Sequence, residues 1–131
     1  MNPGEPISRP LGLTLLALAN FVVGGAFGII ALLAFFQLVG GDAVSGSLVT
    51  VLVSGMVLAT GAVASGLGYL RLSTFLGKTI GTVFGLLVVV YVIYGLAMGQ
   101  PLNVVYVIMV LFGIGNTSLV NTVYKDVFSA E

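Results

Sequence analysis

The chain contains no cysteine and no histidine. Without cysteine it has no disulfides and no thiolate to act as a nucleophile or as a ligand for zinc or iron–sulfur clusters. Without histidine as well, only methionine or tyrosine would remain as axial ligands for haem. No other group of side chains has the pattern of an active site. We therefore expect a protein that is not an enzyme and that has no cofactor, metal site or electron-transfer role.

Charge is also scarce, with four basic and four acidic residues among 131, or 6% of the chain, against 59% hydrophobic residues. Soluble domains carry about a quarter charged residues. No charged residue lies between positions 10 and 41, 43 and 70, or 79 and 124. These long uncharged apolar runs predict an integral membrane protein.

The apolar runs hold no ionisable side chain at membrane depth, where proton- or ion-coupled transporters need one. Small multidrug exporters of four helices carry a carboxylate in the first span, whereas the polar side chains here are Thr14, Asn20 and Gln37. The basic residues form no cluster, so nucleic acid is not an expected partner. This argues against ion-coupled transport and against nucleic-acid binding.

A helix needs about 20 apolar residues to cross a bilayer, and the runs divide into four such helices. Breaks are expected at Gly40 to Asp42 and at Gly99 to Pro101, and Ser73 or Thr74 can cap the third helix. We predict an all-α fold, a bundle of four transmembrane helices in a single membrane domain (1–131). The predicted spans are 11–39, 44–70, 75–98 and 102–124.

The first apolar run follows Arg9 and superficially resembles a secretory signal. It continues to Val39, twenty residues past the cleavage-like Ala17 to Ala19, whereas a cleavable apolar region has 7 to 15 residues. We therefore expect this run to be a retained first span.

The basic residues indicate the orientation of the spans. Arg9 precedes the first span, Arg71 and Lys78 lie in the second connection, and Lys125 follows the fourth span. Lys and Arg near span ends favour the cytoplasmic side, so we expect both termini in the cytoplasm and the protein in a prokaryotic inner membrane. Aromatic residues fit two interfacial belts: Tyr69, Phe75, Tyr124 and Phe128 on the inner side, and Phe35, Phe36, Tyr91, Tyr94 and Tyr106 on the outer side.

Nineteen glycines are present, most of them within the spans. Small residues in membrane helices let two backbones approach closely. Spacings of four or seven residues place several of them on common helix faces: Gly24, Gly28, Ser54, Gly61, Gly77, Gly81 and Gly85. These faces either pack within the bundle or dock another protein or another copy of the chain.

Four polar side chains are expected in one layer in the inner half of the bilayer: Asn20, Thr82, Asn116 and Thr117. At 1.5 Å per residue, Asn20 and Asn116 lie about 12 to 14 Å from the cytoplasmic ends of their spans. An amide facing acyl chains would cost several kcal/mol, so we expect both to point inward. They either join helices by hydrogen bonds or line a pocket for water or a ligand.

Three features of the sequence resemble those of other proteins: the opening Arg9 to Thr14, the basic connection before a glycine-rich third span, and the closing Val123 to Phe128. In these features the chain resembles a broad group of uncharacterised small four-helix prokaryotic integral membrane proteins. The resemblance implies the same topology and gives no mechanism.

Because the chain lacks reactive groups and long connections, we expect a non-catalytic membrane subunit that packs against other transmembrane proteins in a larger complex. Its partners would be membrane lipid and other transmembrane proteins or copies of itself. The alternative is a homo-oligomeric channel or carrier for a neutral or apolar solute.

The orientation is directly testable because the chain has no native cysteine. In the predicted orientation every Lys and Arg faces the cytoplasm and Asp42 lies outside. A cysteine placed at Asp42 should therefore react with a membrane-impermeant thiol reagent added outside intact cells. Reaction only after the inner face is opened to the reagent would show that the topology is inverted.

Overall fold

The computed structural model describes residues 9–41 and 46–128, so that Asp42 of the first expected turn lies outside the described residues. Its elements are α1 (Leu11–Gly40), α2 (Gly46–Arg71), the π-helical segment η1 (Thr74–Thr79), α3 (Ile80–Ala97) and α4 (Val104–Asn121). Four helices are long and apolar enough to cross a membrane, with η1 and α3 forming one segment of 24 residues. The prediction of an all-α chain with four such helices is confirmed.

The fourth helix is shorter than the expected span of 102–124. It begins after Asn103, whose side chain accepts a hydrogen bond from the backbone N–H of Tyr106 at 3.0 Å. Such a cap satisfies one of the free donors at a helix start. The helix ends at Asn121, and Thr122 leaves the helical conformation with a φ of −126°.

The connection between α2 and α3 is a tight turn. Leu72 has a φ of 55°, a left-handed conformation that usually falls to glycine. It lets the backbone N–H of Ser73 reach back to the carbonyl of Gly68 at 2.9 Å, which closes the end of α2. Of the two expected caps, Ser73 and Thr74, it is Ser73 whose hydroxyl accepts from the backbone of Leu76 at 3.2 Å.

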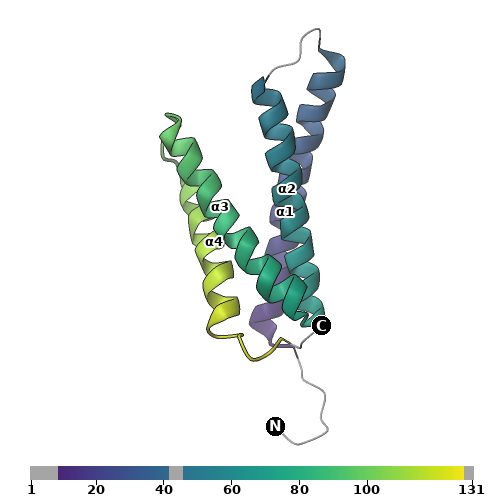
Figure 1. Cartoon of the computed structure of the whole chain (residues 1–131), viewed down its shortest axis with the longest axis vertical. Coiled ribbons are helices and arrows are strands. Elements are labelled where there is room, and N and C mark those ends of the chain that lie inside the picture. Colours follow the sequence, from purple (N-terminus) through teal and green to yellow (C-terminus); the bar gives the residue numbers. More distant parts are fainter. Residues whose placement is uncertain (1–8, 42–45, 129–131) are drawn as a thin grey trace, which may run out of the picture.

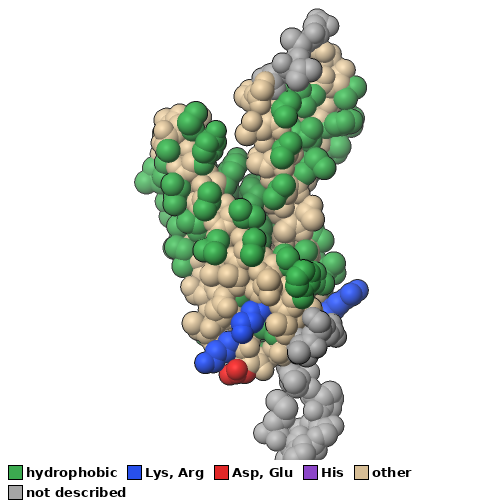
Figure 2. Space-filling view, in the orientation of Figure 1, with side chains coloured by type: hydrophobic (Ala, Val, Ile, Leu, Met, Phe, Trp, Pro, Cys, Tyr) green, Lys and Arg blue, Asp and Glu red, His purple; other side chains and the backbone are tan. Residues whose placement is uncertain are grey.

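The helices form two antiparallel hairpins, α1 with α2 and α3 with α4, and α2 lies beside α3 (Figure 1). At one end of the bundle the hairpins meet, and toward the other end α2 and α3 diverge. We call these the basic end and the open end, because Lys and Arg gather only at the first of them in Figure 2. The arrangement is a wedge that is closed at the basic end.

Two clusters of buried side chains hold the hairpins together. One is at the basic end and contains Leu13, Ala17, Tyr69 and Val120. The other is nearer the middle and contains Leu58, Ala62, Phe84 and Val88. The Arg9 guanidinium adds a contact between α1 and α2 at the basic end, where it donates to the carbonyl of Leu70 at 2.8 Å.

Glycine allows the closest approaches between helices. Gly24 faces α2, where an added Cβ would lie 3.0 Å from Val63, and Gly55 faces α1, where it would lie 3.1 Å from Ala31. Between α3 and α4, a Cβ on Gly85 would meet the Thr117 hydroxyl and lie 2.6 Å from the carbonyl of Gly113. These contacts need a hydrogen atom in place of a side chain.

A matched pair of substitutions tests this packing. Gly85→Leu should lower the free energy of unfolding in mixed detergent micelles by about 1–3 kcal/mol, the usual cost of overpacking. Gly115→Leu is the control, because apart from its own helix no described atom lies within 4 Å of the Cβ position at Gly115. Equal losses for the two variants would contradict the packing described here.

Candidate functional site

A group of fully buried polar side chains joins three helices. The side-chain oxygen Oδ1 of Asn116 in α4 accepts hydrogen bonds from Nδ2 of Asn20 in α1 at 3.1 Å and from the hydroxyl of Tyr69 in α2 at 2.5 Å. All three side chains are fully buried. The two amides also donate to their own helices, to the carbonyls of Leu16 and Phe112. We call Asn20, Tyr69 and Asn116 the Asn116 cluster.

The cluster is not fully satisfied at α1. Oδ1 of Asn20 is the one buried side-chain polar atom of the described residues that has no hydrogen-bond partner. An acceptor left in this state costs about 1–3 kcal/mol. The oxygen of Asn116, by contrast, accepts two hydrogen bonds. Loss of the Asn116 side chain would therefore leave two donors unpaired, whereas loss of Asn20 would also remove an unpaired acceptor.

The other two polar candidates form a separate set between α3 and α4. The hydroxyl of Thr117 donates to the carbonyl of Thr82 at 3.3 Å. Asn121 donates to the Thr82 hydroxyl and to the Thr117 carbonyl, both at 2.7 Å. No hydrogen bond among the described residues joins this set to the Asn116 cluster. The four polar candidates thus make two separate sets of hydrogen bonds, one between the hairpins and one within the second hairpin.

Tyr69 is the member that the sequence did not reveal, because its place at the end of an apolar run suggested an interfacial aromatic. It is fully buried instead. The Tyr69 hydroxyl occupies the space where a Cβ on Gly81 would lie. Gly81 therefore gives the phenol room to reach Asn116. A buried tyrosine hydroxyl usually finds such a partner, but only the fold shows which one.

Five of the glycine candidates face atoms of another segment of this chain: Gly24, Gly61, Gly77, Gly81 and Gly85. Gly61 of α2 meets the ring of Phe84 in α3, where an added Cβ would lie 3.0 Å away. Gly77 lies under the ring of Phe128 and against Gly68, whose own Cβ would collide with the backbone of η1. These positions close the bundle at its basic end and middle.

Two candidates have different surroundings. No described atom outside its own helix lies within 4 Å of the Cβ position at Gly28. Ser54 of α2 donates to the carbonyl of Thr50 at 2.6 Å and lines the gap between the hairpins. Among the described residues Gly28 is therefore not a close helix contact, whereas Ser54 is half-buried and lines a small cavity with Phe27 and Tyr91.

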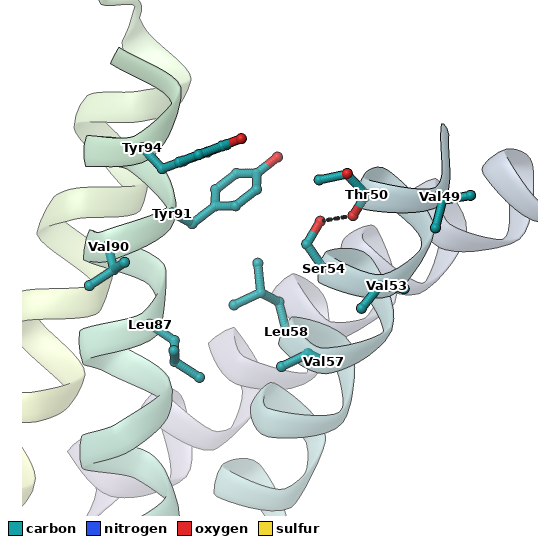
Figure 3. A pocket seen from close by; sticks show the side chains of 10 residues that line it. All are labelled: Val49, Thr50, Val53, Ser54, Val57, Leu58, Leu87, Val90, Tyr91 and Tyr94. Carbon is teal, nitrogen blue, oxygen red and sulfur yellow. Dashed lines mark hydrogen bonds between the residues drawn. The ribbon is translucent and has the colours of Figure 1, made fainter. Parts of the chain in front are cut away.

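That gap is an apolar cleft of about 550 Å³ between α2 and α3, which we call the α2–α3 cleft. Figure 3 shows side chains from both helices facing it, with Tyr91 and Tyr94 reaching from α3 toward Thr50 and Ser54 of α2. Apolar side chains make up the rest of its lining: Val49, Val53, Val57, Leu58, Leu87 and Val90.

A second depression runs along the surface of the first hairpin. One cavity of about 380 Å³ is lined by α1 and α2, with Gly28 and Thr60 in its walls. Another of about 400 Å³ continues along α2 and shares Ala59 and Thr60 with the first. We call the two together the α1–α2 groove.

The described residues contain no group of three or more His, Cys, Asp or Glu placed to hold a metal ion. Comparisons of the chain with protein families, with curated proteins and with solved structures find no match. Any function must therefore be argued from the cluster, the cleft and the groove themselves.

The hydrogen bonds of the Asn116 cluster predict how substitutions change the free energy of unfolding. Asn116→Leu should lower the free energy of unfolding more than Asn20→Leu, because it leaves two buried donors unpaired. The double variant should lose less than the sum of the single losses, because the two residues share one hydrogen bond. We expect a coupling of about 0.5–2 kcal/mol, the range for polar contacts in membranes.

The control for this comparison of single and double variants is Ser65→Ala. The buried hydroxyl of Ser65 donates only within its own helix, to the carbonyl of Gly61. Combining Ser65→Ala with Asn116→Leu should give additive losses. Additive losses for Asn20 and Asn116 would instead mean that the two amides contribute independently.

Proposed function

We propose that this chain is a non-catalytic integral membrane subunit that packs against another transmembrane protein through the α1–α2 groove. The proposal places it in the inner membrane of a prokaryote with both termini in the cytoplasm. The gathering of Lys and Arg at one end of the bundle supports this orientation.

The observation that carries the proposal is a contrast between glycines on one helix. Gly24 of α1 is covered by α2, with an added Cβ 3.0 Å from Val63. Gly25 and Gly28 of the same helix have no described atom outside that helix within 4 Å of their Cβ positions. Glycine in a membrane helix loses dispersion contacts unless another surface comes close. A helix of another protein would restore those contacts.

The chemistry of the groove fits a helix. Small residues from both helices, Gly28, Ala59 and Thr60 among them, lie in its walls. The Thr60 hydroxyl donates to the carbonyl of Met56 at 2.8 Å, so it needs no partner in the groove. Larger apolar side chains complete the lining: Leu32, Phe35, Leu52, Met56, Val63 and Leu67. Small residues without unsatisfied polar groups allow a second backbone to pack closely between them.

A second candidate function is a homo-oligomeric channel or carrier for a neutral or apolar solute. The observation that favours it is the α2–α3 cleft, whose apolar walls carry tyrosine hydroxyls. Pockets of this size with a few polar groups commonly take small ligands. The subunit proposal is preferred because it also accounts for the uncovered glycines.

A crosslinking experiment in native membranes tests the proposal. Two variants with single cysteines, Gly28→Cys and Ile108→Cys, are each treated with a short bifunctional thiol-reactive linker. Ile108 is the control position, because it faces outward on α4 and is 59% exposed. Gly28→Cys should give one discrete product with a protein other than this chain, whereas Ile108→Cys should not. The native chain has no cysteine and serves as the blank.

Gly28→Leu should abolish co-purification of the crosslinked protein while leaving the melting temperature of the isolated chain almost unchanged. A product that contains only two copies of this chain would favour the homo-oligomer instead. Equal crosslinking at Gly28 and Ile108 would contradict docking in the groove.

A further inference from the structure

We propose that the α2–α3 cleft binds an uncharged amphiphile, with an acyl chain between the two helices and a hydroxyl-bearing head at the open end. The site lies between the hairpins and is distinct from the α1–α2 groove. The inference therefore does not depend on the subunit proposal and can fail or succeed separately.

The shape of the cleft favours a chain over a helix. Its walls converge toward the middle of the bundle, where Leu58 lines the cleft and the ring of Phe84 closes on Gly61. A helix with side chains is about 10–12 Å in diameter, and a wedge that narrows to van der Waals contact cannot take one along its length. A flexible hydrocarbon chain can fill such a taper.

Polar groups lie at one end of the cleft only. A second cavity of about 450 Å³ shares Thr50, Ser54, Tyr91 and Tyr94 with the cleft and extends to the open end. There it is lined by Ser47, Gly95, Met98, Gln100 and Tyr106, among others. The combined site is therefore apolar at its narrow end and polar at its mouth, which is the pattern of an amphiphile.

The mouth has hydrogen-bonding capacity to spare. No described residue hydrogen-bonds the hydroxyl of Tyr91 or Tyr94, and Figure 3 shows both rings directed across the cleft toward α2. The hydroxyls of Thr50 and Ser54 donate to their own helix, to the carbonyls of Gly46 and Thr50, and keep lone pairs as acceptors. Tyrosine hydroxyls can donate to an ester carbonyl, and all four oxygens can accept from a head hydroxyl.

The charge of the lining selects the head group. Neither the cleft nor the cavity at its mouth has a charged residue among its lining, and the described basic residues lie at the opposite end of the bundle. Among the described residues of this lining, an anionic phosphate would find no cation and an ammonium group would find no carboxylate. The matching ligand class is a neutral glyceride or a similar hydroxylated lipid.

Single tryptophans can report on this site because the chain has none of its own. Val90→Trp places the reporter in the cleft, and Leu111→Trp places a control on the outer face of α4. The two positions are 58% and 65% exposed. Each lies seven residues from the open end of its helix, at Ala97 and Val104 respectively.

The full chain is reconstituted in phosphatidylcholine vesicles, and a monoacylglycerol with a brominated acyl chain is added as quencher. Trp at position 90 should be quenched saturably, at about tenfold lower mole fraction than Trp at position 111, which corresponds to about 1.4 kcal/mol of preference. Monoolein without bromine should reverse the excess quenching, and anionic phosphatidylglycerol should not.

Two further variants, each combined with Val90→Trp, identify the site. Ser54→Phe fills the cleft and should remove the excess quenching, whereas Ser118→Phe on the exposed surface of α4 should not. Tyr94→Phe removes a hydroxyl without changing the shape of the cleft and should weaken the binding of the quencher several-fold.

Equal quenching of the two reporters would overturn the proposal, and it is the result expected if a second copy of the chain fills the cleft. Competition by phosphatidylglycerol as effective as that by monoolein would overturn the assignment of an uncharged head. Excess quenching that survives Ser54→Phe in a folded protein would place the ligand elsewhere.

Discussion

The side-chain oxygen of Asn116 links the two hairpins by hydrogen bonds. It accepts one hydrogen bond from α1 and one from α2, although it belongs to α4. In a bilayer the hairpins gain little from hydrophobic burial against each other, because lipid tails are as apolar as the helices. Directed polar contacts and close packing must therefore hold them together. The Asn116 cluster supplies the first of these at the basic end.

Close packing depends on glycines that make room for that contact. The missing side chain at Gly81 accommodates the Tyr69 hydroxyl, and the backbones of α2 and η1 meet at Gly68 and Gly77. The turn at Leu72 and the cap at Ser73 bring these segments together. Beyond the ring of Phe84 the hairpins stay in contact through Leu58 and Val88 and through the T-shaped ring pair of Phe27 and Tyr91. Farther toward the open end α2 and α3 separate. The open cleft follows from placing the links near the basic end.

The number of helices was predictable because long uncharged runs are the strongest signal that a membrane chain carries. The sequence did not predict which residues of each helix face a neighbouring helix and which do not. Lipid-facing and buried sides of these helices are equally apolar, so the sequence contains no periodic contrast that separates covered Gly24 from uncovered Gly28. The hydrogen bond between Asn20 and Asn116 fits their predicted equal depth, whereas Thr82 and Thr117 make a separate contact. Tyr69 required the three-dimensional path of α2.

The uncovered surfaces then divide by shape. The groove on the first hairpin has small residues among larger apolar side chains, and its one hydroxyl, that of Thr60, is satisfied, which suits another helix. The α2–α3 cleft tapers and has tyrosine hydroxyls at its mouth, which suits a smaller amphiphile. Among the described residues, Oδ1 of Asn20 is the one buried side-chain polar atom without a partner, and it lies in the Asn116 cluster and in neither surface.

The most direct test of the central role of Asn116 is a distance measurement between the hairpins at the basic end. Spin labels on cysteines at Arg71 of α2 and Thr122 after α4 report the separation by pulsed electron resonance, without interference from native cysteine. The account predicts a narrow distribution in the native chain and a broader, longer one in Asn116→Leu. A distribution that Asn116→Leu leaves unchanged would show that the hairpins are joined by other contacts and would contradict the account.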